Sequence, residues 1–514
     1  MPAVEPLLPI ATSRAHRRRW WILGTLCLSM LVVGLDATVL NVALTPIAES
    51  LRASTGQLQW IVNGFVLAFA VCLIPAGVLG DRIGRRRVLT AGLTVFVLAS
   101  AAAAFTRTPA QLITARAVMG LGAAAVMPLA LSIIPTVFGA AERRRAVAMT
   151  TVAMGLGMPL GPLIGGALLN HFWWGSTLLI NVPLVAVALV AGLIVIPDSR
   201  ETARRPLDPA GLVLSAVGFT ALVYGIVRAP TAGWGSAVTL ICLGVAVLTL
   251  AAFVAVERRA MAPIASRELL RTPLFVWPTV AIALASFVLL GLIFVVPQYL
   301  QAVRGLDALA TGVRLMPLMV ALVIGSGLAA RAERRLSIRV LICLGLVVTA
   351  AGCVLLLWVG VDTGYPLLFC GLFVVGFGFG LSMPPAMDAM LGSLPADSES
   401  TATALNNAVK QLAGALGVAL LGSLLSSAYL AGVTGAAASV PPAAAAAVRG
   451  SVQGAAAVAD QLGGTAGVDL RQAAGTAFVT GMHHVTLACA LVALATAALL
   501  AVALPAGPPA ANLQ

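Results

Sequence analysis

The sequence predicts an all-α protein that crosses a lipid bilayer many times. Of its 514 residues, 60% are hydrophobic and only 10% are charged, and the mean hydropathy is +1.03. A soluble globular chain carries about 25% charged residues. No soluble fold could cover this much apolar surface, so lipid must be the solvent for most of the chain.

The apolar stretches justify the elements in order along the chain. A helix that spans the bilayer needs about 20 mostly apolar residues, and fourteen stretches reach that length. We place the helices at residues 20–43, 57–80, 88–106, 112–136, 147–169, 175–196, 209–229, 236–256, 274–300, 310–331, 337–358, 364–391, 402–430 and 484–505.

Basic residues indicate the orientation of these helices. An arginine-rich lead at 1–19 precedes the first helix, and further arginine clusters occupy alternate connections: 82–87, 143–145, 200–205, 258–271 and 331–339. Loops on the cytoplasmic side carry an excess of Lys and Arg. We therefore expect a multi-pass protein of the cytoplasmic (inner) membrane with both termini in the cytoplasm. The bilayer is then a partner, and the net charge of +13 requires no nucleic acid.

One connection is unusually long. Residues 431–482 are rich in Ala, Gly, Val and Ser, and in this topology they lie on the extracellular side. We expect a long loop that could contain amphipathic helical pieces. Two interpretations stay open, a tolerated surface insertion and a lid or interaction segment.

Asp36 lies within the first apolar stretch. A carboxylate at membrane depth is costly, so it is paired, faces a water-filled cavity or titrates. In a chain with this many helices, a single acid in the first of them favours a carrier that moves protons.

The connection between the second and third helices reads GVLGDRIGRRRVL at residues 77–89. It resembles the signature loop of the major facilitator superfamily, G-x-L-x-D-R-x-G-R-[RK]-x-x-[LT]. In that family the acidic residue and the following arginines form an intracellular gate latch that stabilises the outward-facing state. The resemblance places Asp81, Arg82, Gly84 and Arg85 in that gate.

The fifth helix carries GLGMPLGPLIGG at residues 155–166. Gly157, Gly161 and Gly165 recur every four residues, so they line one face and admit a neighbouring backbone at close range. Pro162 permits a bend. The stretch is similar to the antiporter motif of the superfamily's drug exporters, which favours export over uptake and adds these residues to the gating set.

The first helix, LDATVLNVALTPI, resembles the motif of the fourteen-helix drug:proton antiporters, with Asp36, Thr38 and Asn41 retained. In the fourth helix, Arg116 resembles the arginine of the family's R-x-x-Q-G-x-G motif, although Met119 replaces the Gln. An intramembrane Arg needs a counter-charge, and Asp36 is the candidate. We expect this pair to couple proton movement.

The resemblance covers nearly the whole chain. It implies the major facilitator fold, with a six-helix bundle at 20–196, two inserted linker helices at 209–256 and a second six-helix bundle at 274–505. Substrate is expected between the bundles, in contact with Asn41, Trp60, Asn63, Gln298, Asp388, Asn406, Asn407 and Gln411.

Two charges lie near the cytoplasmic ends of the twelfth and thirteenth helices. Two interpretations are open for Asp388 and Lys410, which is the only lysine of the chain. Either the two residues form a structural ion pair, or Asp388 helps to select or couple substrate. The matching stretch of the thirteenth helix carries amides instead of extra acids, which favours neutral or monovalent lipophilic substrates over dications.

The function expected is proton-coupled efflux of small lipophilic or amphiphilic compounds such as drugs and antibiotics, by a monomer that needs no cofactor beyond the proton gradient. Export of a lipid or an endogenous metabolite on the same fold is an alternative. A membrane enzyme or a non-transporting receptor is disfavoured. An enzyme needs a catalytic or metal-binding cluster, and only the pair His483 and His484, whose neighbouring side chains point to different faces, could suggest one.

Overall fold

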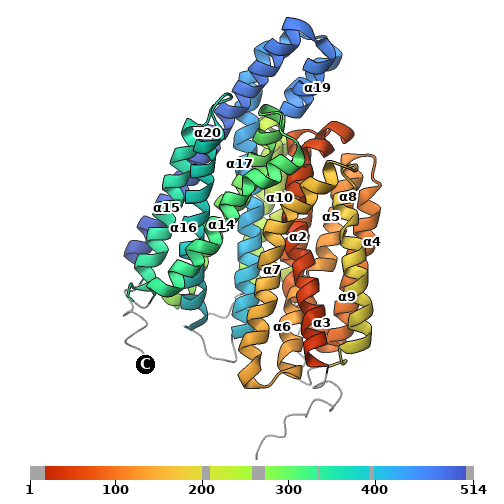
Figure 1. The fold of residues 1–514 in the computed structure, drawn as a ribbon, viewed down its shortest axis with the longest axis vertical. Helices are drawn as coiled ribbons and strands as arrows, with labels where there is room; N and C mark the ends of the chain where they lie inside the picture. Colours follow the sequence, from red (N-terminus) through yellow and green to blue (C-terminus); the bar gives the residue numbers. More distant parts are fainter. Residues whose placement is uncertain (1–17, 200–208, 258–271, 334, 393–398, 505–514) are drawn as a thin grey trace, which may run out of the picture.

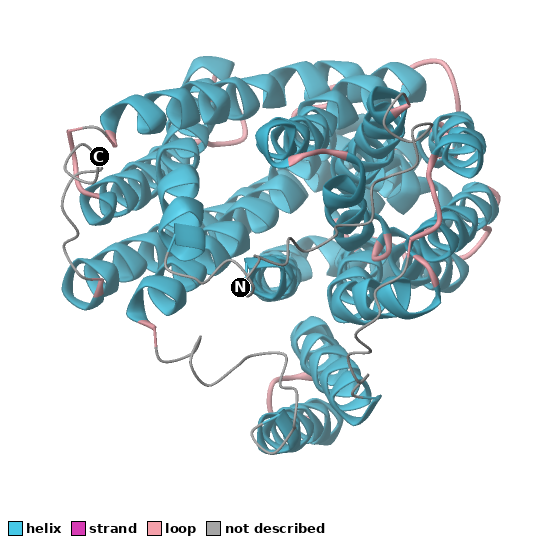
Figure 2. Ribbon diagram, turned by 90° about the horizontal axis from the view of Figure 1, so that it is seen from below, coloured by secondary structure: helices cyan, strands magenta, loops and turns pink. Residues whose placement is uncertain are grey.

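The computed structural model describes residues 18–199, 209–257, 272–333, 335–392 and 399–504. The basic lead at 1–17 and the arginine-rich connections at 200–208 and 258–271 lie outside the described residues. Every regular element in the described ranges is helical (Figure 2). Fourteen of the described helical stretches are long and apolar enough to cross a membrane.

The N-terminal half contains the first six of these stretches. Its helices are α2 (Arg19–Leu51), α3 (Thr55–Ile83), α4 (Arg85–Ala104), α5 (Pro109–Ala123), α6 (Val126–Val137), α7 (Ala140–Leu169), α8 (Ser176–Leu179) and α9 (Asn181–Val195). Two helices, α10 (Pro209–Ala232) and α11 (Ala237–Glu257), then connect this half to the next.

The C-terminal half contains the last six stretches. Its helices are α13 (Pro273–Gln298) with the π-helical turn η1 (Tyr299–Val303), α14 (Ala308–Ala332), α15 (Ile338–Leu355) with the 3-10 turn η2 (Leu356–Trp358), α16 (Tyr365–Gly392), α17 (Glu399–Ala438), α18 (Pro442–Gly450), α19 (Val452–Leu462) and α20 (Gly464–Ala503).

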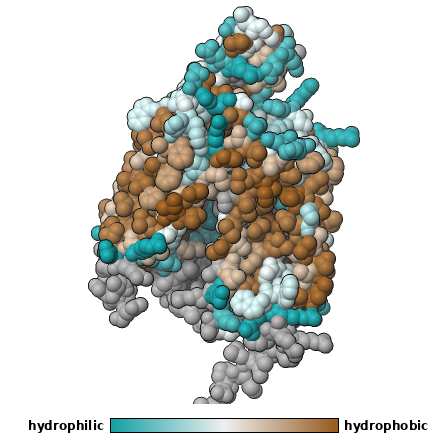
Figure 3. Space-filling model, viewed as in Figure 1, coloured by the Kyte–Doolittle hydropathy of each residue, from teal (hydrophilic) through white to brown (hydrophobic). Residues whose placement is uncertain are grey.

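The two halves stand side by side with their long helices roughly parallel (Figure 1). A broad apolar band crosses the middle of the visible face, and polar residues gather above and below it (Figure 3). This is the surface that a chain surrounded by lipid requires, because only the two ends of the bundle meet water.

Proline explains two breaks that the sequence analysis did not predict. The fourth and sixth stretches were expected to be continuous, but α5 is separated from α6 and α8 from α9. A proline ring clashes with the carbonyl four residues earlier. Pro128 thus disrupts the helix at Ala124, and Pro183 disrupts it at Leu179.

The connection predicted at residues 431–482 is largely helical and not an open loop, so the helical pieces expected within it make up most of its length. α17 continues to Ala438, α20 begins at Gly464, and α18 and α19 form a helical hairpin between them. The 20-residue rule finds only the part of a helix that lies in lipid, and this alanine-rich sequence continues as helix beyond it. The last helix therefore begins about 20 residues earlier than the predicted start at 484.

The halves contact each other near the α18–α19 hairpin. We call this the hairpin end of the bundle, and the opposite end, which carries Asp81, the basic end. Gln301 of η1 donates from Nε2 to the carbonyl of Val42 on α2 at 2.8 Å. Backbones of α7 and α14 also approach closely, because a Cβ built on Gly312 would lie 2.3 Å from the carbonyl oxygen of Pro162. Towards the basic end, the surface is hollowed between the halves (Figure 3).

The inserted helices lie at the seam between the halves. Ser423 of α17 donates its hydroxyl to the carbonyl of Ile226 on α10 at 2.8 Å. Tyr224 of α10 packs against Trp60 of α3, with ring centroids 6.1 Å apart. α10 therefore contacts both halves, whereas α11 packs against α10.

Candidate functional site: a buried ion pair

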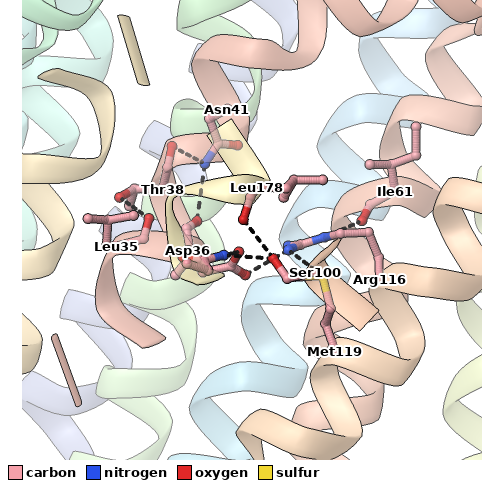
Figure 4. A network of polar contacts seen from close by, with 11 residues as sticks. Leu35, Asp36, Thr38, Asn41, Ile61, Ser100, Arg116, Met119 and Leu178 are labelled. Carbon is pink, nitrogen blue, oxygen red and sulfur yellow. Dashed lines mark hydrogen bonds and ion pairs between the residues drawn. The ribbon is translucent and has the colours of Figure 1, made fainter. Parts of the chain in front are cut away.

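Asp36 and Arg116 form an ion pair inside the N-terminal half. Arg116 donates from a guanidinium nitrogen to Oδ2 of Asp36 at 2.6 Å. The side chain of Arg116 is 2% exposed and that of Asp36 is 0% exposed, so neither charge has bulk water as an alternative partner. The contact joins α2 to α5 across 80 positions of sequence (Figure 4). The predicted counter-charge for Arg116 is thus present in the structure.

Two polar residues that the sequence analysis missed complete the site. Asn181, the first residue of α9, donates from Nδ2 to Oδ1 of Asp36 at 2.9 Å and lies 3.1 Å from the hydroxyl oxygen of Ser100 on α4. Ser100 in turn donates to the carbonyl of Leu178 at 2.8 Å (Figure 4). The signal that identified Asp36, a polar side chain inside an apolar stretch, was also available for Asn181.

The guanidinium of Arg116 has further contacts. Its Nε donates to the carbonyl of Ile61 at 3.4 Å, and its central carbon lies 4.4 Å from the centroid of the Phe65 ring. A cation over an aromatic face is stabilised by the ring quadrupole, the more so without water. Met119, in place of the family's Gln, supplies only a sulfur 4.0 Å from a guanidinium nitrogen.

The glycines of α7 bring this helix against α2. A Cβ built on Gly157 would lie 2.4 Å from the carbonyl oxygen of Leu31, and one on Gly161 would lie 2.2 Å from Oγ1 of Thr38. Gly165 faces Val39 in the same way, at 2.9 Å. The expected small-residue face is therefore in contact with the helix that carries Asp36. Pro162 on the same helix contacts α14, as described above.

The signature loop is bonded within its own half. Arg85 donates from Nε to Oδ1 of Asp81 at 2.9 Å and from a terminal nitrogen to the carbonyl of Ser132 at 3.0 Å. Gly84 has φ of +120°, a backbone conformation that L side chains rarely adopt. A Cβ there would also lie 2.5 Å from a carboxylate oxygen of Asp198. Arg82 lies in the last turn of α3, next to this turn.

The substrate contacts predicted in the N-terminal half do not all lie together. Asn41 is buried and donates to the carbonyls of Ala37 and Thr38 on its own helix at 3.2 and 3.4 Å. Asn63 is fully buried, and neither atom of its amide has a hydrogen-bond partner. Gln59, one helical turn earlier, donates from Nε2 to the carbonyls of Val418 and Ala419 on α17, so Asn63 lies on the face of α3 that meets α17. Trp60 is instead placed against α10, at the seam.

Gln298 lies at the hairpin end. It donates from Nε2 to the carbonyl of Phe294 at 2.7 Å, and its Oε1 accepts from Gln453 of α19 at 3.2 Å. Its polar atoms are thus engaged by the protein in this conformation. Gln301, which the sequence analysis did not select, links the halves through Val42.

The predicted ion pair between Asp388 and Lys410 is absent. Lys410 has no salt-bridge partner among the described residues. Asp388 is exposed near the end of α16. Burial, and then the Asp388 carboxylate, raise the pKa of Glu333 above its usual range. Two opposite charges near the same ends of their helices are therefore not necessarily in contact.

Three amides of α17 were predicted to contact substrate. Asn406 is buried, with its Nδ2 3.5 Å from the sulfur of Met387 and its Oδ1 without a hydrogen-bond partner. Asn407 is buried, and Gln411 is half-buried. All three lie in the part of α17 nearest the basic end, whereas Gln298 lies at the hairpin end. The predicted substrate residues therefore extend along the axis of the bundle.

The paired histidines lie within α20, not at its start. Nε2 of His483 is 2.8 Å from the carbonyl of Val359. In the described part of the chain, no three His, Cys, Asp or Glu residues gather as a metal site would require.

Comparisons with known proteins agree with this architecture. Residues 26–418 match the family model described as Major Facilitator Superfamily. The chain is 34% identical to the multidrug efflux pump LfrA of Mycolicibacterium smegmatis, covering 96% of this chain and 98% of that protein. It is 33% identical to the tetracenomycin C resistance and export protein of Streptomyces glaucescens, covering 80% and 76%. It is 34% identical to the puromycin resistance protein pur8 of Streptomyces alboniger, covering 83% and 86%.

Solved structures show the same fold. A bacterial homologue of the human lysosomal transporter Spinster, in an inward-facing and occupied conformation, superposes with a TM-score of 0.66 at 18% identity, covering 94% of this chain and 96% of that one. With the whole-length relatives and the matched family model, the conclusion is plain: the protein is a membrane transporter, not an enzyme, and it belongs to the major facilitator superfamily.

Proposed function

We propose that this protein exports small lipophilic or amphiphilic compounds in exchange for protons, by alternating access. The observation that carries the proposal is the buried pair of Asp36 and Arg116. A fully desolvated carboxylate with an arginine partner is costly to maintain for stability alone, and intramembrane ionisable groups are typical of proton pathways. Relatives named for multidrug efflux and for tetracenomycin C export support the direction of transport.

The orientation follows from charge. The basic end carries the arginine cluster 82–87, so we place it in the cytoplasm together with both termini. The hairpin end is then extracellular. Because the halves contact each other at the hairpin end, the conformation described here is inward-facing, and substrate would enter from the cytoplasm or the inner leaflet. We propose a monomer as the functional unit, since each chain contains both halves of the fold.

Protonation of Asp36 supplies the switch. A proton arriving from outside would neutralise the carboxylate and remove its attraction for Arg116, which could then reorient. Asp36 lies on α2, α2 packs on the glycine face of α7, and α7 contacts α14 of the other half through Pro162 and Gly312. A change at the ion pair is thus connected to the interface between the halves through one helix. Loss of the proton to the cytoplasm would restore the pair.

The substrate would lie between α3 and α17. Asn63 and Asn406 each carry buried amide atoms without a partner, which is unfavourable unless a ligand uses them. Such groups suit neutral or singly charged lipophilic compounds with hydrogen-bonding atoms. One relative, 32% identical, is named a methyl viologen resistance protein, and methyl viologen is a dication. The charge preference of this protein therefore needs a direct comparison.

The test uses the purified protein in sealed liposomes. With the interior acidic, proton efflux should drive accumulation of ethidium, and a protonophore should abolish it. Methyl viologen under the same gradient should be transported more slowly. If none of a broad panel of amphiphiles moves in response to the imposed gradient, proton-coupled export is wrong for this protein.

A further inference from the structure

The α18–α19 hairpin is wedged across the line where the two halves meet. Its α19 buries one apolar face, formed by Val452, Ala455, Val458 and Ala459. The opposite face carries exposed polar residues such as Asp460 and Gln461. In Figure 1, α19 lies at the upper end of the bundle, above α2. A merely tolerated surface insertion would not need such a buried face.

Gln453 of α19 contacts both halves at once. Its side chain is 1% exposed. Its Nε2 lies 3.2 Å from Oε1 of Gln298 on α13 and 3.5 Å from Oγ1 of Thr45 on α2. Its own Oε1 is buried without a hydrogen-bond partner. One carboxamide thus connects the N-terminal half, the C-terminal half and the hairpin.

Two further side chains hold the hairpin in place. On the C-terminal side, the hydroxyl of Tyr429 on α17 lies 2.8 Å from the carbonyl of Val448 and 3.1 Å from that of Ser451. On the N-terminal side, Thr55 of α3 donates its hydroxyl to the carbonyl of Gly450 at 3.2 Å. The hairpin is covalently part of the C-terminal half, so its contacts with Thr45 and Thr55 cross between the halves.

These contacts cannot survive an opening of the hairpin end. If α2 and α13 separate there, the Gln453 amide cannot reach both Thr45 and Gln298, because each contact is already at the long end of hydrogen-bond distances. Because the hairpin is covalently part of the C-terminal half, the contacts that opening breaks are those to Thr45 and Thr55 of the N-terminal half.

We propose that the α18–α19 hairpin is the extracellular gate of this transporter, and that Gln453 holds it shut by bonding both halves. This inference rests on the alternating-access function proposed above. In each transport cycle the hairpin leaves α2 and α3 to release substrate outward, and its return restores the closed exit.

A reversible cross-link tests the movement. A Cβ built on Gly450 would lie 3.9 Å from Cβ of Ser54, within the range of about 3.5–4.5 Å found in disulfides. The variant Ser54→Cys/Gly450→Cys should therefore form a disulfide when treated with copper phenanthroline, detected by loss of reaction with a maleimide-PEG. Each single cysteine variant, treated identically, controls for the seven native cysteines and for the altered α3 cap.

We expect gradient-driven ethidium transport by the oxidised double variant to fall at least tenfold below that of the same sample reduced with dithiothreitol. Oxidised protein that transports at half the reduced rate or more would overturn the gate. If the reduced double variant and the single variants also fail to transport, the proposed export function is wrong. That result is distinct from a failure of the gate, which concerns only the difference between oxidised and reduced protein.

A second measurement, the rate of disulfide formation, tests the role of Gln453 without a transport assay. Adding Gln453→Ala to the cysteine pair should slow disulfide formation at least threefold, because the hairpin spends less time against α3. Gln461→Ala, on the exposed face of the same helix, should leave the rate unchanged. Equal rates for the two alanine variants would show that Gln453 does not hold the hairpin closed.

Discussion

Replacement of Asp36 by Asn separates the charge of the site from its shape. The variant keeps an oxygen that can accept from Asn181, and it changes the side-chain volume little. It removes the negative charge 2.6 Å from the Arg116 guanidinium. An amide cannot carry a proton at any physiological pH, so any proton coupling through this position must end.

The size of the stability change follows from the geometry. With an effective dielectric constant of about 20, unit charges 2.6 Å apart attract by about 6 kcal/mol. Part of this attraction only offsets the desolvation of the two groups. Removing one partner of a buried pair typically costs about 3–5 kcal/mol, because the other charge stays buried and uncompensated. We expect Asp36→Asn to lower the free energy of unfolding in mixed micelles by that amount.

The double variant Asp36→Asn/Arg116→Gln distinguishes stability from coupling. It removes both charges, so it should recover at least half of the stability lost by Asp36→Asn. Proton coupling should remain absent in both variants. In liposomes, each folded variant should move ethidium down its concentration gradient but should not accumulate it when a pH gradient is imposed.

Two results would refute this reasoning. Gradient-driven accumulation by Asp36→Asn at the rate of the unchanged protein would remove Asp36 from the proton pathway. A double variant no more stable than the single one would show that the cost lies in lost packing or hydrogen bonds and not in an unpaired arginine.

Three further substitutions test other parts of the structure. Gly157→Ala should lower the free energy of unfolding by about 1–3 kcal/mol by separating α7 from α2. The control Gly155→Ala, whose Cβ would meet nothing within 4 Å, should stabilise the same helix or leave its stability unchanged. Equal effects of the two substitutions would contradict the close packing of α7 on α2. Asn63→Leu should raise stability by about 1–3 kcal/mol, since it removes an unpartnered amide, while the KM for ethidium rises; an unchanged KM would exclude a substrate contact. For Glu333, a raised pKa means that the folded protein binds the proton more tightly than the unfolded chain, so stability falls as pH rises above about 4.3 towards the raised value. Glu333→Gln should therefore increase the melting temperature relative to the unchanged protein near pH 7 but not near pH 4, and a pH-independent difference would contradict a raised pKa at Glu333.

Much of the fold could be predicted because its signals are local. Span number depends on the length of each apolar stretch, and the fourteen predicted stretches correspond to fourteen helical stretches in the structure. The spacing of Gly157, Gly161 and Gly165 indicated a close helix contact for the same reason, since helical periodicity places them on one face. Asp36 stood out because a carboxylate in an apolar stretch is costly wherever its helix packs.

What the sequence determined by itself was therefore the membrane architecture and the presence of a charge that needed a partner within it. Only the tertiary structure decided which side chains share that environment: Asn181 contacts both Asp36 and Ser100, whereas Lys410 does not meet Asp388. Likewise, Gln453 in an apparent loop reaches the line between the halves. The physical reason is that helix positions follow from local hydropathy, but contacts across tens or hundreds of residues depend on how helices pack and rotate against one another, which one-dimensional patterns do not specify.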